Sequence, residues 1–117
     1  MTQDLNQLLT EKNDMIKQGL IVAATDKFFA DHATTLDFDG AKTSNKTEML
    51  KKMEGFAGAI KNVNEITLHH SSFSENVSFA EYTFHFDMKD GSTILWHEII
   101  RSVWEDNKIV NEQYFKN

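Results

Sequence analysis

Apolar side chains in the first part of the chain recur at helical spacing. Roughly the first eighteen residues form one amphipathic pattern, which predicts a helix that stops at Gly19. A second helical pattern runs from Ile21 to Phe29 and ends before residues 33–38. The β-branched and apolar composition of residues 33–38 predicts a short strand. The apolar positions of the two helical patterns are Leu5, Leu8, Leu9, Met15, Ile16, Ile21, Ala24, Phe28 and Phe29.

A third helix and a run of strands complete the pattern. Asn45 and Glu48 form a capping pair before an apolar stripe that extends from Met49 to Ile60. The remaining sequence predicts four strands, at residues 63–73, 77–88, 93–104 and 108–115, with turns at Ser74-Glu75-Asn76, Asp90-Gly91 and Asp106-Asn107. Helices followed by hairpin-connected strands predict an α+β fold, with the helices on one face of an antiparallel sheet.

The pairing of the strands follows if each hairpin closes through a two-residue loop. Counting from these turns places Arg101 opposite Glu112, which predicts a cross-strand ion pair. The same face then carries several other polar side chains, and because burying them unpaired is costly, we expect a pocket that holds water or ligand. These polar side chains are His69, Ser71, Tyr82, His97 and Tyr114.

The opposite face of the predicted sheet is rich in large apolar residues. A face exposed only to solvent would not carry Trp96, Ile100, Trp104 and Ile109, so we expect a homodimer through this surface. A single β-bulge would exchange the two faces beyond it. In that case the pocket would instead contain the following residues: Trp96, Glu98, His85 and Thr83.

Composition narrows the classes of function. The 117 residues are enough for one domain, at residues 1–117. A net charge of −6 argues against binding nucleic acid or an anionic membrane surface, and the absence of cysteine excludes disulfides and thiolate chemistry. The chain has no apolar run of membrane-spanning length, and its first residues do not have a signal-peptide pattern, so we expect a cytoplasmic protein.

Two stretches resemble a known family. The hairpin of residues 101–115, with Trp104, a polar turn, Glu112 and a terminal aromatic residue, is similar to the C-terminal hairpin of SnoaL-like proteins in the nuclear-transport-factor-two-like superfamily. Residues 30–37 resemble the segment of ketosteroid isomerases in which a helix ends shortly before an aspartate in the first strand. The resemblance implies a cone-shaped curved sheet wrapped around about three N-terminal helices, with an internal pocket, and dimers that form through the sheet.

The resemblance also implies candidate catalytic residues. Asp37 stands where the isomerase family has its general base, and a carboxylate in an apolar cleft has a raised pKa suited to moving a proton beside a carbonyl. The alternative is that Asp37 is a turn residue next to Asp39-Gly40. Glu112 matches a family glutamate and could act as an acid or base beside His69 or His97, or it could simply pair with Arg101.

The chain departs from the family pattern at three positions. The first predicted helix has no tyrosine, Ile100 stands near the position of a catalytic strand aspartate, and Phe115 stands where SnoaL-like cyclases have an aspartate. These differences argue against the isomerase oxyanion hole and against ring closure by the cyclase route.

The sequence leaves two functions open. In the first, a small, largely apolar molecule binds between helices and sheet, and an acid–base isomerase, cyclase or dehydratase acts on it without a cofactor. In the second, the chain is a non-catalytic dimeric binding or protein-interaction module. No histidine spacing indicates a metal site. The candidate catalytic residues are Asp37, Glu112 and His97, and the candidate ligand contacts are His69, Tyr82, Arg101, Tyr114 and Phe28.

Overall fold

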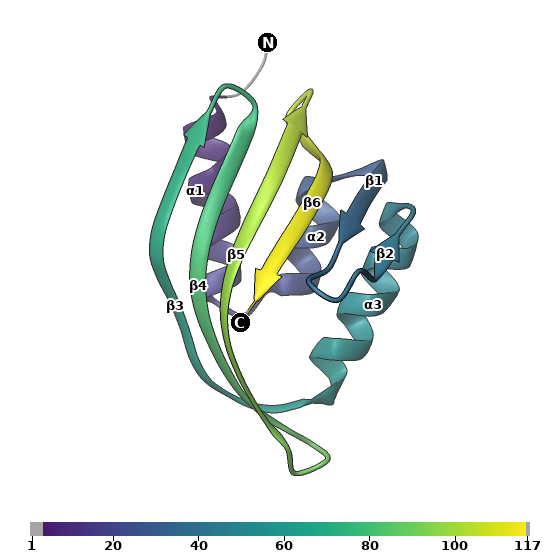
Figure 1. The fold of residues 1–117 in the computed structure, drawn as a ribbon, viewed down its shortest axis with the longest axis vertical. Coiled ribbons are helices and arrows are strands. Elements are labelled where there is room, and N and C mark those ends of the chain that lie inside the picture. The colour runs from purple at the N-terminus through teal and green to yellow at the C-terminus, as the bar shows by residue number, and fades with distance from the viewer. Residues whose placement is uncertain (1–3, 117) are drawn as a thin grey trace.

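The computed structural model describes residues 4–116 and combines three helices with a six-stranded sheet (Figure 1). The helices lie on one face of a strongly curved sheet, so the predicted α+β class and cone-like arrangement are confirmed. The helices are α1 (Leu5–Lys17), α2 (Ile21–Phe28) and α3 (Lys46–Ala59). The strands are β1 (Phe29–Leu36), β2 (Lys42–Thr43), β3 (Ile60–Ser74), β4 (Val77–Met88), β5 (Thr93–Glu105) and β6 (Lys108–Lys116).

The sheet is mixed rather than wholly antiparallel as predicted. Its strand order is β2-β1-β6-β5-β4-β3, and β1 runs parallel to β6 while the other neighbouring pairs are antiparallel. Hairpins fix the direction of β3 to β6 relative to one another. No hairpin joins β1 to β6, because α3 and three other long strands separate them in the chain, so turn counting could not predict their relative direction.

Local sequence signals explain where the helices begin and end. The Asp4 carboxylate accepts the backbone N–H of Asn6 at the start of α1. The Asn45 side chain accepts the backbone N–H of Glu48 at the start of α3, which confirms the predicted capping pair. α2 ends at Phe28, and Phe29 is the first residue of β1 instead of the last of a helix, because it pairs with Ile109 in β6. No helix within residues 4–116 is long and apolar enough to cross a membrane.

Two of the three predicted turns are confirmed. Ser74 pairs with Val77 and Glu105 pairs with Lys108, which leaves two-residue loops between them. The third turn is longer than predicted. The Met88 backbone N–H donates to the Ser92 carbonyl, so these two residues lie opposite each other and three residues, Lys89-Asp90-Gly91, form the loop between them. The predicted register between these strands is therefore wrong by one residue.

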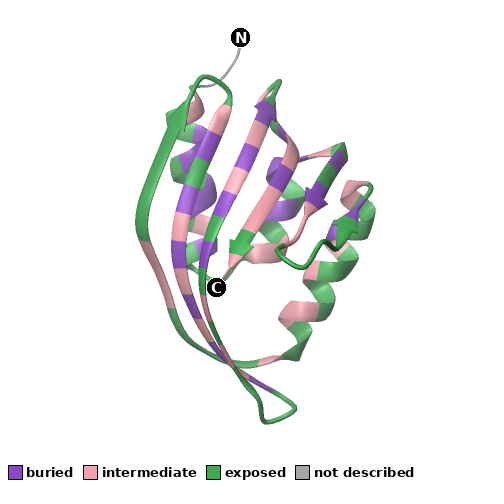
Figure 2. Cartoon of the chain, viewed as in Figure 1, coloured by how far each residue is buried: buried purple, intermediate pink, exposed green. Residues whose placement is uncertain are grey.

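This one-residue difference reverses the face of β5. Tyr82 lies opposite Glu98 rather than Ile99, and the residues of β5 that face the helices are Glu98, Ile100, Ser102 and Trp104. The alternation of buried and exposed residues is visible along β4 and β5 (Figure 2). A bulge between Val103 and Trp104 then shifts the β5–β6 register by one more residue, so β6 still points Glu112 and Tyr114 inward.

The residues predicted to form a dimer interface belong to the interior. Ile100, Trp104 and Ile109 are 5%, 4% and 0% exposed, and Trp96 packs against the same core. An interface made of these four side chains is therefore wrong, because the helices already cover them. The homodimer itself stays a prediction, as does the cytoplasmic location.

Candidate functional site

A cavity of about 290 Å³ lies between the helices and the inner face of the sheet. This volume is just below the range that is typical of small-molecule sites, about 300–1,000 Å³. Its wall is mostly apolar and aromatic, contributed by all three helices and by β1, β4, β5 and β6. Six ionisable side chains other than tyrosine reach it: Lys12, Asp37, Lys52, Glu98, Glu112 and Lys116.

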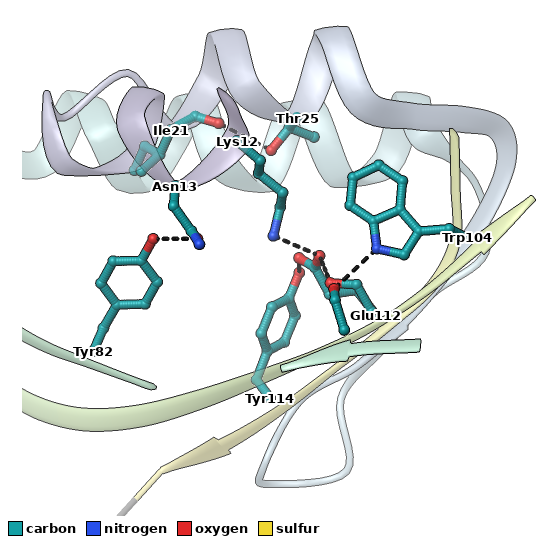
Figure 3. A network of polar contacts seen from close by, with 10 residues as sticks. Lys12, Asn13, Ile21, Thr25, Tyr82, Trp104, Glu112 and Tyr114 are labelled. Carbon is teal, nitrogen blue, oxygen red and sulfur yellow. Dashed lines mark hydrogen bonds and ion pairs between the residues drawn. The ribbon is translucent and has the colours of Figure 1, made fainter. Parts of the chain in front are cut away.

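Glu112 on β6 is the centre of a buried polar network (Figure 3). Its Oε2 accepts a hydrogen bond from Ser102 Oγ at 2.6 Å and lies 3.1 Å from Lys12 Nζ. Its Oε1 accepts the Tyr114 hydroxyl at 2.7 Å. Glu112 is 4% exposed, so these three donors replace the water that an ionised carboxylate would otherwise bind.

Lys12 reaches this network because it lies on the apolar stripe of α1. Leu8, Lys12 and Ile16 are four residues apart and all are buried, which places the lysine directly over the sheet. The predicted ion pair between Arg101 and Glu112 is wrong, since Arg101 lies opposite Gln113 and Glu112 lies opposite Ser102. A cation from the helix layer therefore neutralises Glu112.

Tyr114 is held as a hydrogen-bond donor. Burial raises the pKa of its hydroxyl well above the ordinary value, and the nearby Glu112 carboxylate raises it further. The hydroxyl consequently stays protonated at neutral pH. Tyr114 and Glu112 both line the cavity, where the hydroxyl and the carboxylate form one fixed polar patch in an apolar wall.

A second polar cluster surrounds Lys116 at the end of β6. Lys116 Nζ lies 3.4 Å from Asp37 Oδ1, 3.4 Å from Glu98 Oε2 and 3.8 Å from the centre of the Trp96 ring. The lysine side chain is only 9% exposed. It therefore bridges a carboxylate that follows β1 and a carboxylate on β5 while it covers an aromatic face.

Glu98 has the chemistry of an acid–base group. Burial raises its pKa to about 7, even though Lys116 acts in the opposite direction. A carboxyl group with such a pKa is populated in both protonation states near neutral pH, as proton transfer requires. Within residues 4–116 no group of three metal-ligating side chains lies close enough to hold an ion.

Asp37 lies at the cavity and in a turn at the same time. Its carbonyl accepts the Gly40 N–H, its backbone N–H donates to Ala41, and its carboxylate accepts the Phe38 N–H at 2.8 Å. The same carboxylate contacts Lys116 and lines the cavity. Its predicted role as a general base stays a prediction.

The structure gathers some of the predicted site residues and separates others. Asp37, Glu112 and Tyr114 line one cavity. His97 is on the outer face of the sheet, where its Nε2 contacts Glu81 and its ring approaches that of His69, so these histidines do not lie beside Glu112 as predicted.

The remaining predicted contacts are not part of the cavity wall. Tyr82 is fully buried, but a bulge places Leu68 opposite it instead of His69, and its hydroxyl donates to Asn13 at 2.6 Å (Figure 3). Phe28 packs edge-on against Trp104 in the core. Arg101 belongs to the outward-facing set of β5.

The primary prediction omits five polar residues of the cavity: Lys12, Thr25, Lys52, Glu98 and Lys116. The alternative prediction, in which a bulge exchanges the two faces of the sheet, places Trp96, Glu98, His85 and Thr83 in the pocket. Trp96 and Glu98 do line the cavity, whereas His85 and Thr83 are not in its wall. The signal for Lys12 was its position between Leu8 and Ile16 on the helix stripe. The signal for Lys116 is its position two residues after Tyr114, because side chains two apart on a strand face the same side and Tyr114 is predicted to face inward.

Known structures share this fold. A protein from Mesorhizobium loti that is described as a SnoaL-like polyketide cyclase superposes with a TM-score of 0.85 at 15% identity, covering 97% of this chain and 99% of that one. A protein with a ketosteroid-isomerase-like fold from Catenulispora acidiphila, in complex with trimethylamine, has a TM-score of 0.75 at 15% identity, covering 98% and 86%. A protein described as a hydroxylase from Streptomyces galilaeus has a TM-score of 0.77 at 16% identity, covering 96% and 87%.

These likenesses confirm the predicted resemblance to SnoaL-like and ketosteroid-isomerase-like folds of the nuclear-transport-factor-two-like group. Identities of 15% and 16% establish the fold, and they leave ligand and reaction open. No protein-family model matches the sequence, and no curated protein is significantly similar to it.

Proposed function

We propose that this chain, which has the SnoaL-like and ketosteroid-isomerase-like fold, binds a small, largely apolar molecule in its cavity and moves a proton within that molecule. The observation that carries the proposal is an apolar cavity that contains a buried carboxyl group with a pKa of about 7, Glu98. Apolar lining with a few fixed polar groups is typical of small-molecule sites, and a carboxyl group of that pKa can accept or donate a proton at neutral pH.

The polar groups of the cavity suggest separate roles. Glu98 is the candidate acid or base, and Asp37 is a second carboxylate on the other side of Lys116. Glu112 and the protonated Tyr114 form a fixed polar patch, in which the Tyr114 hydroxyl already donates its hydrogen bond to the Glu112 carboxylate. Isomerisation, cyclisation and dehydration each remove a proton from carbon and deliver a proton to carbon, to a new alkoxide oxygen or to a departing hydroxyl, and such groups can do both without a cofactor.

A thermal-shift screen of the purified protein tests the proposal. The compounds are steroids, polyketide fragments, fatty acids and aromatic acids, with small amines added because one neighbour of the same fold holds trimethylamine. A ligand at a hundredfold its dissociation constant stabilises by about 2.7 kcal/mol, which shifts the melting temperature by several degrees.

The Glu98→Gln and Asp37→Asn variants separate binding from catalysis. We expect a ligand that stabilises the wild type to bind Glu98→Gln but to be turned over slowly or not at all. Asp37→Asn reports whether the second carboxylate contributes. A screen without any stabilising compound would favour the alternative, a non-catalytic binding or protein-interaction module.

One observation favours an interaction surface as the second candidate function. The outer face of the sheet exposes Phe79, Ile99 and Phe115 by 39%, 40% and 45%, and Ile99 lies directly opposite Phe115. Large apolar side chains gathered on an exposed sheet are typical of protein interfaces. We propose this face, in place of the buried residues first predicted, as the surface through which two copies pair.

A further inference from the structure

The ammonium group of Lys116 occupies a site built for a cation. Two carboxylate oxygens, Asp37 Oδ1 and Glu98 Oε2, each lie 3.4 Å from its Nζ. The Trp96 ring centre lies 3.8 Å away and the Phe38 ring centre 5.1 Å away. Two carboxylates and the faces of two aromatic rings are the groups that proteins use to bind organic ammonium compounds.

The aromatic surface of this site continues into the cavity. The Phe56 ring stacks on Trp96 with centres 5.5 Å apart and planes at 16°, and Phe86 meets Phe56 edge-on at 5.7 Å. Trp96, Phe56 and Phe86 all line the cavity wall. An ammonium group placed over Trp96 can therefore carry an apolar substituent into the same space.

The charges in contact with Lys116, rather than those of the whole cavity, favour a positive ligand at this place. Lys12 is bound to Glu112, whereas Lys116 is the one cation within residues 4–116 that pairs with Glu98. If Lys116 rotates away, Asp37 and the ionised form of Glu98 remain without this positive partner. A second ammonium group in the same place restores the original charge balance, while an anionic ligand would add to the repulsion.

From these contacts we infer that the cavity takes an organic ammonium compound, which binds over Trp96 by displacing the Lys116 side chain. This inference rests on the proposed function, because it requires that the cavity binds a small molecule. Lys116 then acts as a tethered occupant that lowers the affinity for the external cation. Its four-carbon stem allows the ammonium to leave the site by rotation alone.

Two isosteric probes and two variants test the inference. Choline and 3,3-dimethylbutan-1-ol have the same shape, but only choline is charged. Lys116→Met removes the tethered cation and keeps the length of the side chain, and Lys89→Met removes the same charge from the exposed β4–β5 loop. Binding is followed by NMR, through the separate indole N–H signals of Trp96 and Trp104.

We expect choline to bind Lys116→Met at least about tenfold more tightly than it binds the wild type or Lys89→Met. The neutral alcohol should bind all three proteins within about threefold, and choline should shift the Trp96 signal more than the Trp104 signal. Trp96→Leu should remove the preference for choline over the alcohol. Lys116→Gln serves as a second variant if Lys116→Met does not fold.

Three results would overturn the inference, and they are distinguishable from failure of the proposed function. One is equal affinity of choline for the wild type and both Lys116 variants, and another is a preference for the alcohol. The third is the absence of any shift at Trp96 with either probe. If the alcohol or a compound of the wider screen still binds, the small-molecule cavity stands and only its cation specificity is refuted.

Discussion

Lys12 Nζ on α1 lies 3.1 Å from Glu112 Oε2 on β6, and both side chains are almost completely removed from solvent, at 4% and 5% exposure. This ion pair connects the first helix to the last strand beside the cavity. Removing one partner of a buried pair leaves the other charge uncompensated, at a cost of about 3–5 kcal/mol, whereas removing both costs less.

A double-mutant cycle at this pair tests its role. We expect Lys12→Met and Glu112→Gln each to lower the free energy of unfolding by about 3–5 kcal/mol, and the double variant to cost clearly less than the sum. Urea denaturation measures all four proteins. The control is Lys27→Met, which breaks the exposed pair with Glu11 and should cost about 1 kcal/mol or less. Additive effects at Lys12 and Glu112 would show that the pair is not coupled.

Glu98 should make the stability depend on pH. Burial raises its pKa to about 7 from an ordinary value of 4.5, so between these pH values the folded protein holds a proton that the unfolded chain has lost. The free energy of unfolding therefore falls by about 2–4 kcal/mol in total as the pH rises through this window, and it levels off above it.

The variant Glu98→Gln should flatten that dependence, because glutamine does not titrate. The measurement is urea denaturation at several pH values, with Glu105→Gln, at an exposed position of β5, as the matched control. Relative to Glu98→Gln, the free energy of unfolding of the wild type should fall as the pH rises from 4.5 to 7. A difference that does not change with pH would contradict a raised pKa at Glu98.

The hydrogen bond between Tyr82 and Asn13 anchors α1 to β4. Tyr82 is fully buried and donates its hydroxyl to Asn13 Oδ1 at 2.6 Å. Tyr82→Phe leaves the buried amide oxygen unpaired and should cost about 1–3 kcal/mol in urea denaturation. Combining it with Asn13→Leu should recover part of the loss, since both polar groups are then gone. If Tyr82→Phe is as stable as the wild type, this bond does not anchor the helix.

The outer face of the sheet should control self-association. Ile99→Asp places a charge opposite Phe115 on the exposed face, where it would face apolar residues of a second copy. We expect sedimentation velocity at micromolar concentration to report a dimer for the wild type and a monomer for Ile99→Asp. The control is Leu20→Asp, which places the same charge at an exposed apolar position between α1 and α2, on the helix side of the sheet. A wild type that sediments as a monomer would remove the proposed interface.

Much of the fold follows from local sequence signals. The Asn45 cap, the bounds of β4 and the two-residue turns before β4 and β6 agree with the prediction because each depends on residues close together in the chain. Glu112 and Tyr114 also face inward as predicted. Their direction survives because the longer β4–β5 loop and the bulge at Val103 each shift the register by one residue, and the two shifts cancel at β6.

The sequence did not predict which side chains of β5 face the cavity, because this depends on the length of the same β4–β5 loop. One extra loop residue turns every side chain of a strand to the other face, which exchanged His97 and Arg101 for Glu98 and Trp96 at the cavity. Apolar patterning did not resolve the choice, because both faces of β5 carry large apolar residues. Ion pairs between distant elements, such as Lys12 with Glu112, depend on the helix–sheet packing and have no local signal.

The most direct test of a functional cavity is to fill it. Ala24 lines the cavity, whereas its neighbour Ala23 on α2 is exposed, so Ala24→Leu and Ala23→Leu add the same side chain inside and outside. Isothermal titration with a compound from the screen should give unchanged affinity for Ala23→Leu and a loss of at least about tenfold for Ala24→Leu, or about 1.4 kcal/mol. Equal affinity for the two variants, with both folded, would place the ligand elsewhere and contradict the account.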